Sequence, residues 1–163
     1  MANIDYSRLT NDAAVVEILS AADKLKTKKE KIDILRKYSS RADLMAVLRG
    51  AYAKNIEWAV PIGDLPEGRT YSSAPSIDTA DDRMIRAYKQ FIYLIKGGPA
   101  ANMMQSKREQ VYLDLLSSMH IDEAKLLQSI VQKKLPYKGI TAAIVAEAFP
   151  AIWPKETKES KSA

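Results

Sequence analysis

Apolar residues recur three and four positions apart along most of the 163-residue chain, and this spacing is typical of helices with one buried face. The pattern predicts helices over residues 12–22, 27–38, 40–52, 79–96, 99–104, 106 to 116 or 119, 122–132 and 141–149. No stretch has a convincing strand pattern, and no repeat of fixed period is visible. The sequence therefore predicts an all-α fold, an orthogonal or irregular bundle of seven to eight helices.

Start and stop signals mark several of these helices. Segments 27–30, 40–43 and 106–109 each place Ser or Thr three residues before Glu or Asp, which is the spacing of a capping box. Gly97-Gly98 is predicted to end the longest helix by adopting positive φ. Pro99 then suits the first position of the next helix, because the N–H that it lacks would be unpaired there.

Residues 54–77 lack a helical pattern. Pro and Gly residues rule out a long helix there, namely Pro61, Gly63, Pro66, Gly68 and Pro75. Ile56, Trp58 and Val60 alternate with polar or small residues, which is consistent with a short extended piece. We prefer the interpretation that they pin a long surface loop to the core. A loop of this length is either functional or mobile.

The length predicts one helical domain, residues 1–154, followed by a polar tail, residues 155–163, that we expect to be disordered. A hydrophobic fraction of 47% is ordinary for a folded soluble chain. There is no cysteine, which excludes disulfides and thiolate metal sites. No apolar run has the length of a membrane helix, and the N-terminus lacks a secretory signal, so we expect a cytoplasmic protein.

Positive charge is concentrated in separate blocks, although the formal net charge is only +5. Residues 23–41 contain eight Lys or Arg against three Asp or Glu, residues 83–110 six against one, and residues 131–139 three against none. Residues 64–82 are acidic instead, with one against five. This distribution fits a cationic face for a polyanion or, equally, ordinary solvated helix surface.

No set of residues in the sequence indicates catalysis. The single histidine, His120, lies between two predicted helices, where we expect a structural role. Asp78, Asp81 and Asp82 stand at the start of a predicted helix, so compensation of the helix dipole is a better interpretation than a metal site. No glycine-rich nucleotide-binding loop is present. We therefore expect a protein that is not an enzyme and that uses neither cofactor nor metal.

Two basic junctions between helices are the strongest candidates for a binding site. The first is Lys96-Gly97-Gly98-Pro99, and the second runs from Lys133 to Thr141. Glycine lets a partner approach the backbone, the next helix start offers unpaired N–H groups, and lysine adds a charge for phosphate. The candidate anion-binding residues are Lys96, Gly97, Gly98, Lys134, Lys138, Gly139 and Thr141. The alternative is that each glycine only ends a helix.

Three blocks of sequence resemble the N-terminal DNA-binding domain of ATP-dependent DNA ligases, most closely that of the short ligases of tailed bacteriophages. They are residues 27–37 with 44–52, residues 94–101, and residues 135–154. The blocks follow the family's order with similar gaps and together span about residues 10–154. Gly98-Pro99 stands where the family has Asn-Ala, and the closing block ends in the aromatic and proline pattern Phe149-Pro150-Ala151-Ile152-Trp153-Pro154.

The resemblance implies a helical domain that lies along the minor groove of duplex DNA and contacts phosphates and sugars without regard to sequence. It places both basic junctions at the DNA, and we expect Lys28, Lys29 and Arg41 to be outer electrostatic contacts. The chain lacks a Lys-x-Asp-Gly adenylation motif and ends where a ligase would begin its nucleotidyltransferase domain, so ligation by this chain alone is not expected. We expect a non-catalytic duplex DNA-binding protein of a tailed bacteriophage, in the infected host cell or in the virion.

Two other functions stay open at the level of sequence. The ligase-like bundle could be the scaffold of a phage structural or interaction protein, in which the 54–77 loop with Trp58 and the tail engage a protein partner. It could also be an accessory subunit that supplies DNA binding in trans to a separate catalytic polypeptide.

Overall fold

The computed structural model describes residues 13–60 and 65–150. Within these ranges the chain forms seven α-helices and no strand, with only isolated β-bridges, so the predicted all-α fold is confirmed. The α-helices are α1 (Val15–Lys24), α2 (Lys28–Lys37), α3 (Ala42–Tyr52), α4 (Met84–Ala87), α5 (Gln105–Ser118), α6 (Ile121–Val131) and α7 (Ala142–Ala148). Short 3₁₀ helices lie between α3 and α5, namely η2 (Ile77–Thr79), η3 (Tyr88–Tyr93) and η4 (Gly98–Ala100).

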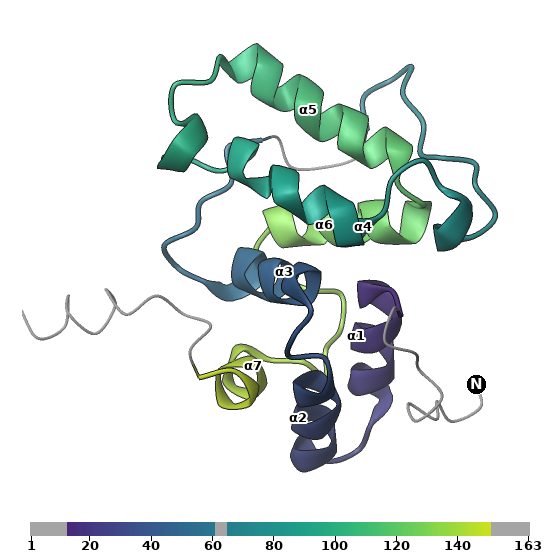
Figure 1. Ribbon diagram of the computed structural model, residues 1–163, viewed down its shortest axis with the longest axis vertical. Helices are drawn as coiled ribbons and strands as arrows, with labels where there is room; N and C mark the ends of the chain where they lie inside the picture. The colour runs from purple at the N-terminus through teal and green to yellow at the C-terminus, as the bar shows by residue number, and fades with distance from the viewer. Residues whose placement is uncertain (1–12, 61–64, 151–163) are drawn as a thin grey trace, which may run out of the picture.

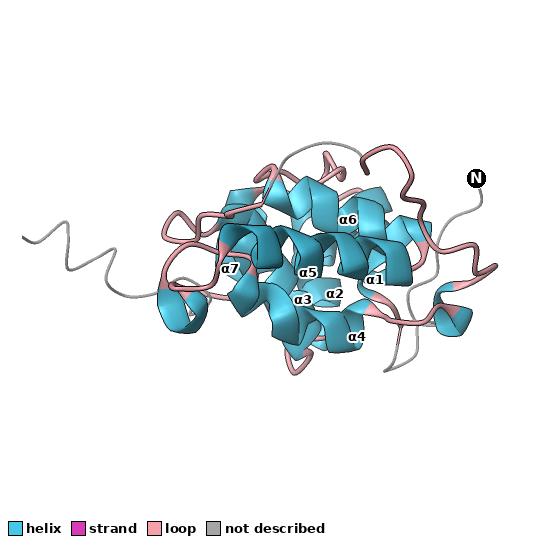
Figure 2. Ribbon diagram, turned by 90° about the horizontal axis from the view of Figure 1, so that it is seen from above, coloured by secondary structure: helices cyan, strands magenta, loops and turns pink. Residues whose placement is uncertain are grey.

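Helix α6 is the central element of the bundle and contacts α1, α3 and α5. In Figure 1, α4, α5 and α6 form the upper part, α1, α2 and α7 form the lower part, and α3 lies between them. The view from above shows the helices gathered in the middle and the connecting loops at the edges (Figure 2). One cluster of buried apolar side chains draws residues from all seven α-helices. No helix in the described ranges is long and apolar enough to cross a membrane.

The predicted capping box at the start of α2 is confirmed. The Glu30 N–H donates to the Thr27 hydroxyl at 3.1 Å, and the Thr27 N–H donates to the Glu30 carboxylate at 3.2 Å. Ile32, Leu35 and Tyr38 are buried on one side of the helix, as their spacing predicts. The predicted start of the first helix at residue 12 and the predicted tail at 155–163 lie outside the described residues.

The other two predicted capping boxes, at 40–43 and 106–109, are wrong. Arg41 stands at the N-cap of α3 and Met104 at the N-cap of α5, and neither side chain makes a capping hydrogen bond. The Asp43 carboxylate instead accepts from the Arg41 guanidinium, with an Nη2–Oδ2 distance of 2.7 Å, in a nearly buried site. An arginine only two residues away therefore takes the carboxylate that the capping-box spacing assigned to the helix end. The predicted helix over 99–104 is also wrong, since only the short turn η4 forms there.

The predicted long helix over residues 79–96 is wrong, because the segment divides into α4, η3 and a non-helical stretch before them. The Asp82 N–H donates to the Ser118 carbonyl at 2.9 Å, which ties this stretch to the end of α5. The Met84 N–H donates to the Glu123 carboxylate at 3.0 Å. Aromatic residues and an isoleucine fill much of η3, and such residues have modest helix propensity, so tertiary contacts decide the local conformation.

Glu123 is a buried acid at the meeting of α4 and α6, with only 1% of its surface exposed. Burial raises the pKa of its carboxyl to about 7, against the opposing effects of the Met84 N–H and of the nearby Arg83. The charged form is disfavoured because little water reaches it. Glu123 therefore makes the start of α4 sensitive to pH.

The predicted anchoring of the loop after α3 is confirmed. Val60 is buried, and Trp58 packs partly buried against the core. The Trp58 Nε1–H donates to the Gly50 carbonyl at 2.9 Å, and its ring meets Phe91 edge-on with centroids 5.5 Å apart. The backbone at Trp58 forms only an isolated antiparallel bridge with Ile95. Trp58 therefore fixes the segment after α3 against the chain that follows η3.

Candidate nucleic-acid interface

The first junction forms an exposed turn between η3 and η4. Gly97 and Gly98 have φ values of 73° and 71°, which confirms the predicted positive φ. A Cβ atom at either position would meet no atom within 4 Å, so backbone conformation and not lack of space requires glycine. Pro99 lies in the first turn of η4, as predicted. The outer side of this turn is therefore open.

A buried arginine holds the base of the turn. Arg108 is 4% exposed, and its terminal nitrogens donate at 2.8–3.2 Å to four backbone carbonyls, those of Tyr93, Ile95, Ala100 and Met103. Its Nε–H donates to the Gln105 side chain at 3.3 Å. A buried cation is tolerated when hydrogen bonds satisfy it, and here the acceptors flank Gly97-Gly98 on both sides.

The second junction begins with a lysine in a conformation that favours glycine. Lys133 has a φ of 63°, and no other non-glycine residue in the described ranges has positive φ. Its N–H donates to the Ile130 carbonyl at 2.8 Å, and the Lys134 N–H donates to the Ser129 carbonyl at 3.1 Å. This is the Schellman arrangement at the end of α6, in which glycine usually takes the position of Lys133. The left-handed conformation costs a lysine about 1–2 kcal/mol, so other contacts must hold it.

The ammonium group of Lys133 makes those contacts at the C-terminal end of α3. Its Nζ donates to the carbonyls of Gly50, Ala53 and Ile56 at 3.1, 2.6 and 3.0 Å. Burial lowers the pKa of this amine below its usual range. The three carbonyls and the negative end of the α3 dipole favour the charged form. Lys133 is therefore an exposed residue whose ammonium group is engaged by three carbonyls of the protein itself.

Both junctions are attached to the same short segment, residues 50–59. Lys133 bonds to its first half, as described above. Two antiparallel backbone hydrogen bonds, each 2.8 Å long, join residues 57–59 to residues 94–96. In Figure 1, the turn before α5, the C-terminal end of α3 and the end of α6 all lie on the left side of the molecule. The fold therefore brings the two junctions together.

This segment and the two segments bonded to it carry exposed lysines. Lys54, Lys96 and Lys134 are exposed, and we call them, together with Gly97 and Gly98, the basic junction face. The Lys96 ammonium lies 3.5 Å from the Glu57 carboxylate, and both side chains are mostly in solvent. An exposed pair at this distance contributes little, so Lys96 can exchange Glu57 for another anion.

The remainder of the second junction packs against α1. The Gly139 N–H donates to the Asp23 carboxylate at 2.6 Å. A Cβ at Gly139 would lie 2.8 Å from the Asp23 carbonyl oxygen, so this glycine permits the close approach of the protein's own backbone. Thr141 caps α7 as predicted, because its hydroxyl accepts from the Ile144 N–H at 3.3 Å. Of the predicted residues in this stretch, Lys138 keeps an exposed charge.

The predicted outer contacts differ in accessibility. The Arg41 side chain is 12% exposed and pairs with Asp43 in the interior, so it does not face a ligand. Lys28 and Lys29 are exposed and lie 2.8 and 3.2 Å from acidic partners, Glu147 and Asp33. Exposed pairs of this kind are weak, so both lysines can turn to phosphates.

Sequence reasoning did not select three cations that shape this region, although one of them, Lys133, begins the predicted second junction. Lys54 follows α3 in a stretch without a glycine junction, so the pattern that selected the other lysines passed over it. Lys133 and Arg108 bond to carbonyls, which no side-chain pattern marks. The positive φ of Lys133 could not be inferred, because the usual signal is a glycine.

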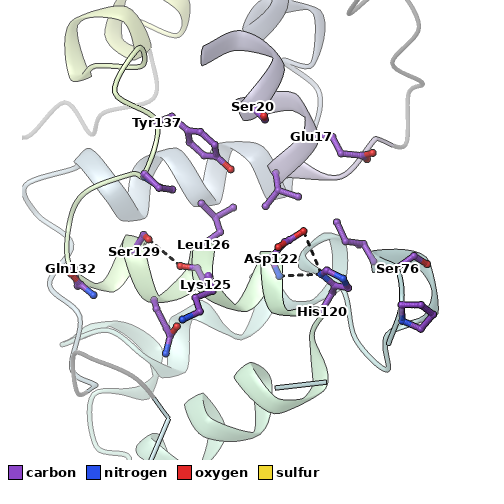
Figure 3. Close-up of a pocket in the computed structure, with 15 residues that line it drawn as sticks. Glu17, Ser20, Ser76, His120, Asp122, Lys125, Leu126, Ser129, Gln132 and Tyr137 are labelled. Atoms are coloured by element: carbon purple, nitrogen blue, oxygen red, sulfur yellow. Dashed lines mark hydrogen bonds and ion pairs between the residues drawn. The ribbon is translucent and has the colours of Figure 1, made fainter. Parts of the chain in front are cut away.

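A separate cavity of about 930 Å³ lies between α1, α6 and the chain near Ser76 and Tyr137 (Figure 3). Its wall carries both signs of charge and therefore does not favour a polyanion. His120 borders it and has the structural role predicted for it, because its Nδ1 accepts from the Asp122 N–H at 3.0 Å and caps α6. No group of three His, Asp or Glu side chains in the described ranges could hold a metal ion.

The chain is thus an all-α protein with a basic surface built from two helix junctions. Residues 18–137 match the model of a family of unknown function (DUF6433), and the chain belongs to that family. The matched range contains the whole basic junction face, with Arg108 and Lys133, and ends just before Lys138. No curated protein and no solved structure matches the chain.

Proposed function

We propose that this protein binds duplex DNA through the phosphate backbone, without sequence preference and without catalysing a reaction. The basic junction face, with Lys138, Lys28 and Lys29 around it, is the contact surface. The resemblance to the DNA-binding domain of phage DNA ligases directs the proposal to the minor-groove side of the duplex and to a tailed bacteriophage.

The observation that carries the proposal is the attachment of both junctions to residues 50–59. It supports a common site, because exposed lysines lie in this short stretch and in the two chain segments that are bonded to it. The open glycine turn lets a phosphate approach the backbone closely. Lysines act as flexible point charges for phosphates, which suits binding that ignores sequence.

The number of exposed lysines predicts the salt dependence. Lys54, Lys96, Lys134 and Lys138 can neutralise up to four phosphates, which gives log K against log salt a slope of about −3.6. Lys133 and Arg41 are not in this count, because the Lys133 ammonium bonds to three carbonyls and Arg41 pairs with Asp43 in the interior. A larger slope would require Lys28 and Lys29 to leave their acidic partners.

Fluorescence anisotropy with a labelled duplex of about 20 base pairs, titrated from about 50 to 200 mM salt, tests the proposal. The double variant Lys96→Glu, Lys134→Glu should lose at least about tenfold in affinity and reduce the slope by about 1.8. Duplexes of unrelated sequence should bind alike. Absence of duplex binding by the unaltered protein at about 50 mM salt would overturn the proposal.

Lys26→Glu is the matched control. Lys26 is exposed in the linker between α1 and α2, which lies at the bottom of Figure 1, far from the turn before α5. Its substitution makes the same change of charge as either single variant, Lys96→Glu or Lys134→Glu, so it is compared with those and should alter affinity by no more than about twofold. An equal loss in this variant would show that total charge and not the basic junction face governs binding.

The two alternatives lead to different measurements. A protein-docking role for the 54–77 loop would have to use residues other than Trp58, because that side chain packs inward. Co-purification of a partner that is unaffected by Lys138→Glu would support it. An accessory role would show as a faster reaction when the chain is added to a separate ligase or polymerase.

A further inference from the structure

We propose that Arg108 and Lys133 are positioning residues of the basic junction face, each of which holds one junction in its binding geometry without touching the DNA. This inference rests on the proposed function, since it concerns the same surface. It divides the basic residues of the region into lysines that bind phosphate and two cations, the buried Arg108 and the carbonyl-bonded Lys133, that arrange them.

Arg108 acts on the first junction. Glycine restricts the backbone less than any other residue, so two successive glycines leave this turn free to adopt many conformations. The Arg108 guanidinium bonds to two carbonyls before the glycines and to two after them. These bonds fix both ends of the turn in one arrangement. A turn that is already ordered does not lose that entropy when DNA binds.

Lys133 acts on the second junction and connects it to the first. The left-handed conformation of Lys133 sets the direction in which the chain leaves α6, and therefore the position of Lys134. The Lys133 ammonium bonds to Ile56, the residue before Glu57, whose carbonyl accepts from the Lys96 N–H. A short chain of hydrogen bonds thus fixes Lys134 relative to Lys96.

Two substitutions at Lys133 are decisive, because they separate the effect of its ammonium group from the effect of its left-handed backbone conformation. Lys133→Gly removes the ammonium and keeps the left-handed turn without strain, so this variant is expected to stay folded. Lys133→Met removes the ammonium and keeps the strain. Arg108→Lys is the companion at the first junction, since an ammonium cannot reach all four carbonyls that the guanidinium reaches.

Affinity for a duplex as a function of salt is the first readout, at a temperature where circular dichroism shows each variant to be folded. A positioning role predicts a Kd about tenfold higher for Lys133→Gly, by the same factor at every salt concentration, because the exposed lysines are intact. A slope reduced by about 0.9 would make Lys133 a phosphate contact and would overturn the inference. An unchanged Kd would overturn it as well.

Amide hydrogen exchange is the second readout and does not need DNA. The Lys96 and Ala59 N–H groups, which join residues 94–96 to residues 57–59, should exchange at least about tenfold faster in Lys133→Gly. Unchanged exchange at both amides overturns the inference. Failure of the unaltered protein to bind DNA would remove the proposed function alone, because exchange would still report whether Lys133 orders the first junction.

Discussion

Both helix junctions contain residues with positive φ, and they stabilise this backbone conformation in different ways. At the first, glycines adopt positive φ in open surroundings, and a distant arginine orders the turn from below. At the second, Lys133 adopts positive φ, and its own side chain reaches 77–83 positions back along the sequence to hold it there. The first turn therefore depends on a residue outside it, whereas the second holds itself.

This difference shows that a basic residue near a glycine turn need not serve a ligand. Lys133 and Lys134 are adjacent in the sequence and both are exposed, yet the ammonium of Lys133 bonds to three carbonyls of the segment after α3. Gly139 is likewise a glycine beside a lysine, but its space is filled by Asp23. Position in the fold, and not residue type, separates the structural cations from those available to DNA.

The largest expected effect comes from removing the support of the first turn. Arg108→Met should lower the free energy of unfolding by about 4 kcal/mol, because four carbonyls near the protein interior lose their donor. Urea denaturation followed by circular dichroism measures this change. Arg86→Met is the control, with an expected loss below about 1 kcal/mol at an exposed site. Similar losses in the two variants would contradict a special role of Arg108.

The next prediction concerns Glu123, the buried acid whose carboxyl group accepts from the Met84 N–H at the start of α4 and which can lose its proton. Because the folded-state pKa of Glu123 is raised to about 7, its neutral form stabilises the fold fully below about pH 4.5. That stabilisation declines as the pH rises towards 7, by up to about 3 kcal/mol. Urea unfolding between pH 5 and 8 should show this slope in the unaltered protein and lose it in Glu123→Gln. Parallel curves for the two proteins would refute the assignment.

Alanine at two of the glycines separates lack of space from backbone conformation. Gly139→Ala should cost about 2 kcal/mol, because the new Cβ would contact the Asp23 backbone and the chain must shift. Gly97→Ala should cost only about 1 kcal/mol, since its Cβ meets nothing and positive φ is the sole penalty. Thermal unfolding of both variants provides the comparison. The reverse order would mean that the second junction can open around Gly139.

The smallest expected effect concerns the acid on the basic junction face. Glu57→Gln should raise duplex affinity about twofold at low salt, because Lys96 loses its competing partner. Anisotropy titrations measure this gain, which should vanish at high salt. Glu67→Gln makes the same charge change at another exposed position and should give a smaller gain in duplex affinity. Equal gains in both variants would assign the effect to net charge.

Local signals in the sequence predicted what is decided locally. The Thr27 box, the Thr141 cap and the two positive glycine φ values each depend on residues within three positions. The prediction of a long helix over 79–96 was wrong because the Met84 N–H, where α4 begins, donates to the carboxylate of Glu123, which is 39 residues away. The predicted role of Arg41 overlooked its bond to the Ala13 carbonyl, 28 residues away, which holds the guanidinium in the interior beside Asp43.

The candidate site shows the same division. Lys96, Gly97, Gly98 and Lys134 could be selected because lysine and glycine mark a basic turn in any sequence. The segment 50–59 that joins them could not be selected in this way, since it bonds to Lys133 and to residues 94–96 through its backbone atoms. Backbone hydrogen bonds carry no residue type, so one sequence alone does not reveal them.

The attachment of both junctions to residues 50–59 also has a consequence for how the protein matures. The basic junction face joins chain segments near residues 54, 96 and 134, so it cannot exist until the ribosome has released the end of α6 and two long loops have closed. A nascent or truncated chain would carry the same lysines on segments that are not yet joined by these hydrogen bonds. Under the proposed function, affinity for DNA would then be gained late and all at once, when the fold is complete.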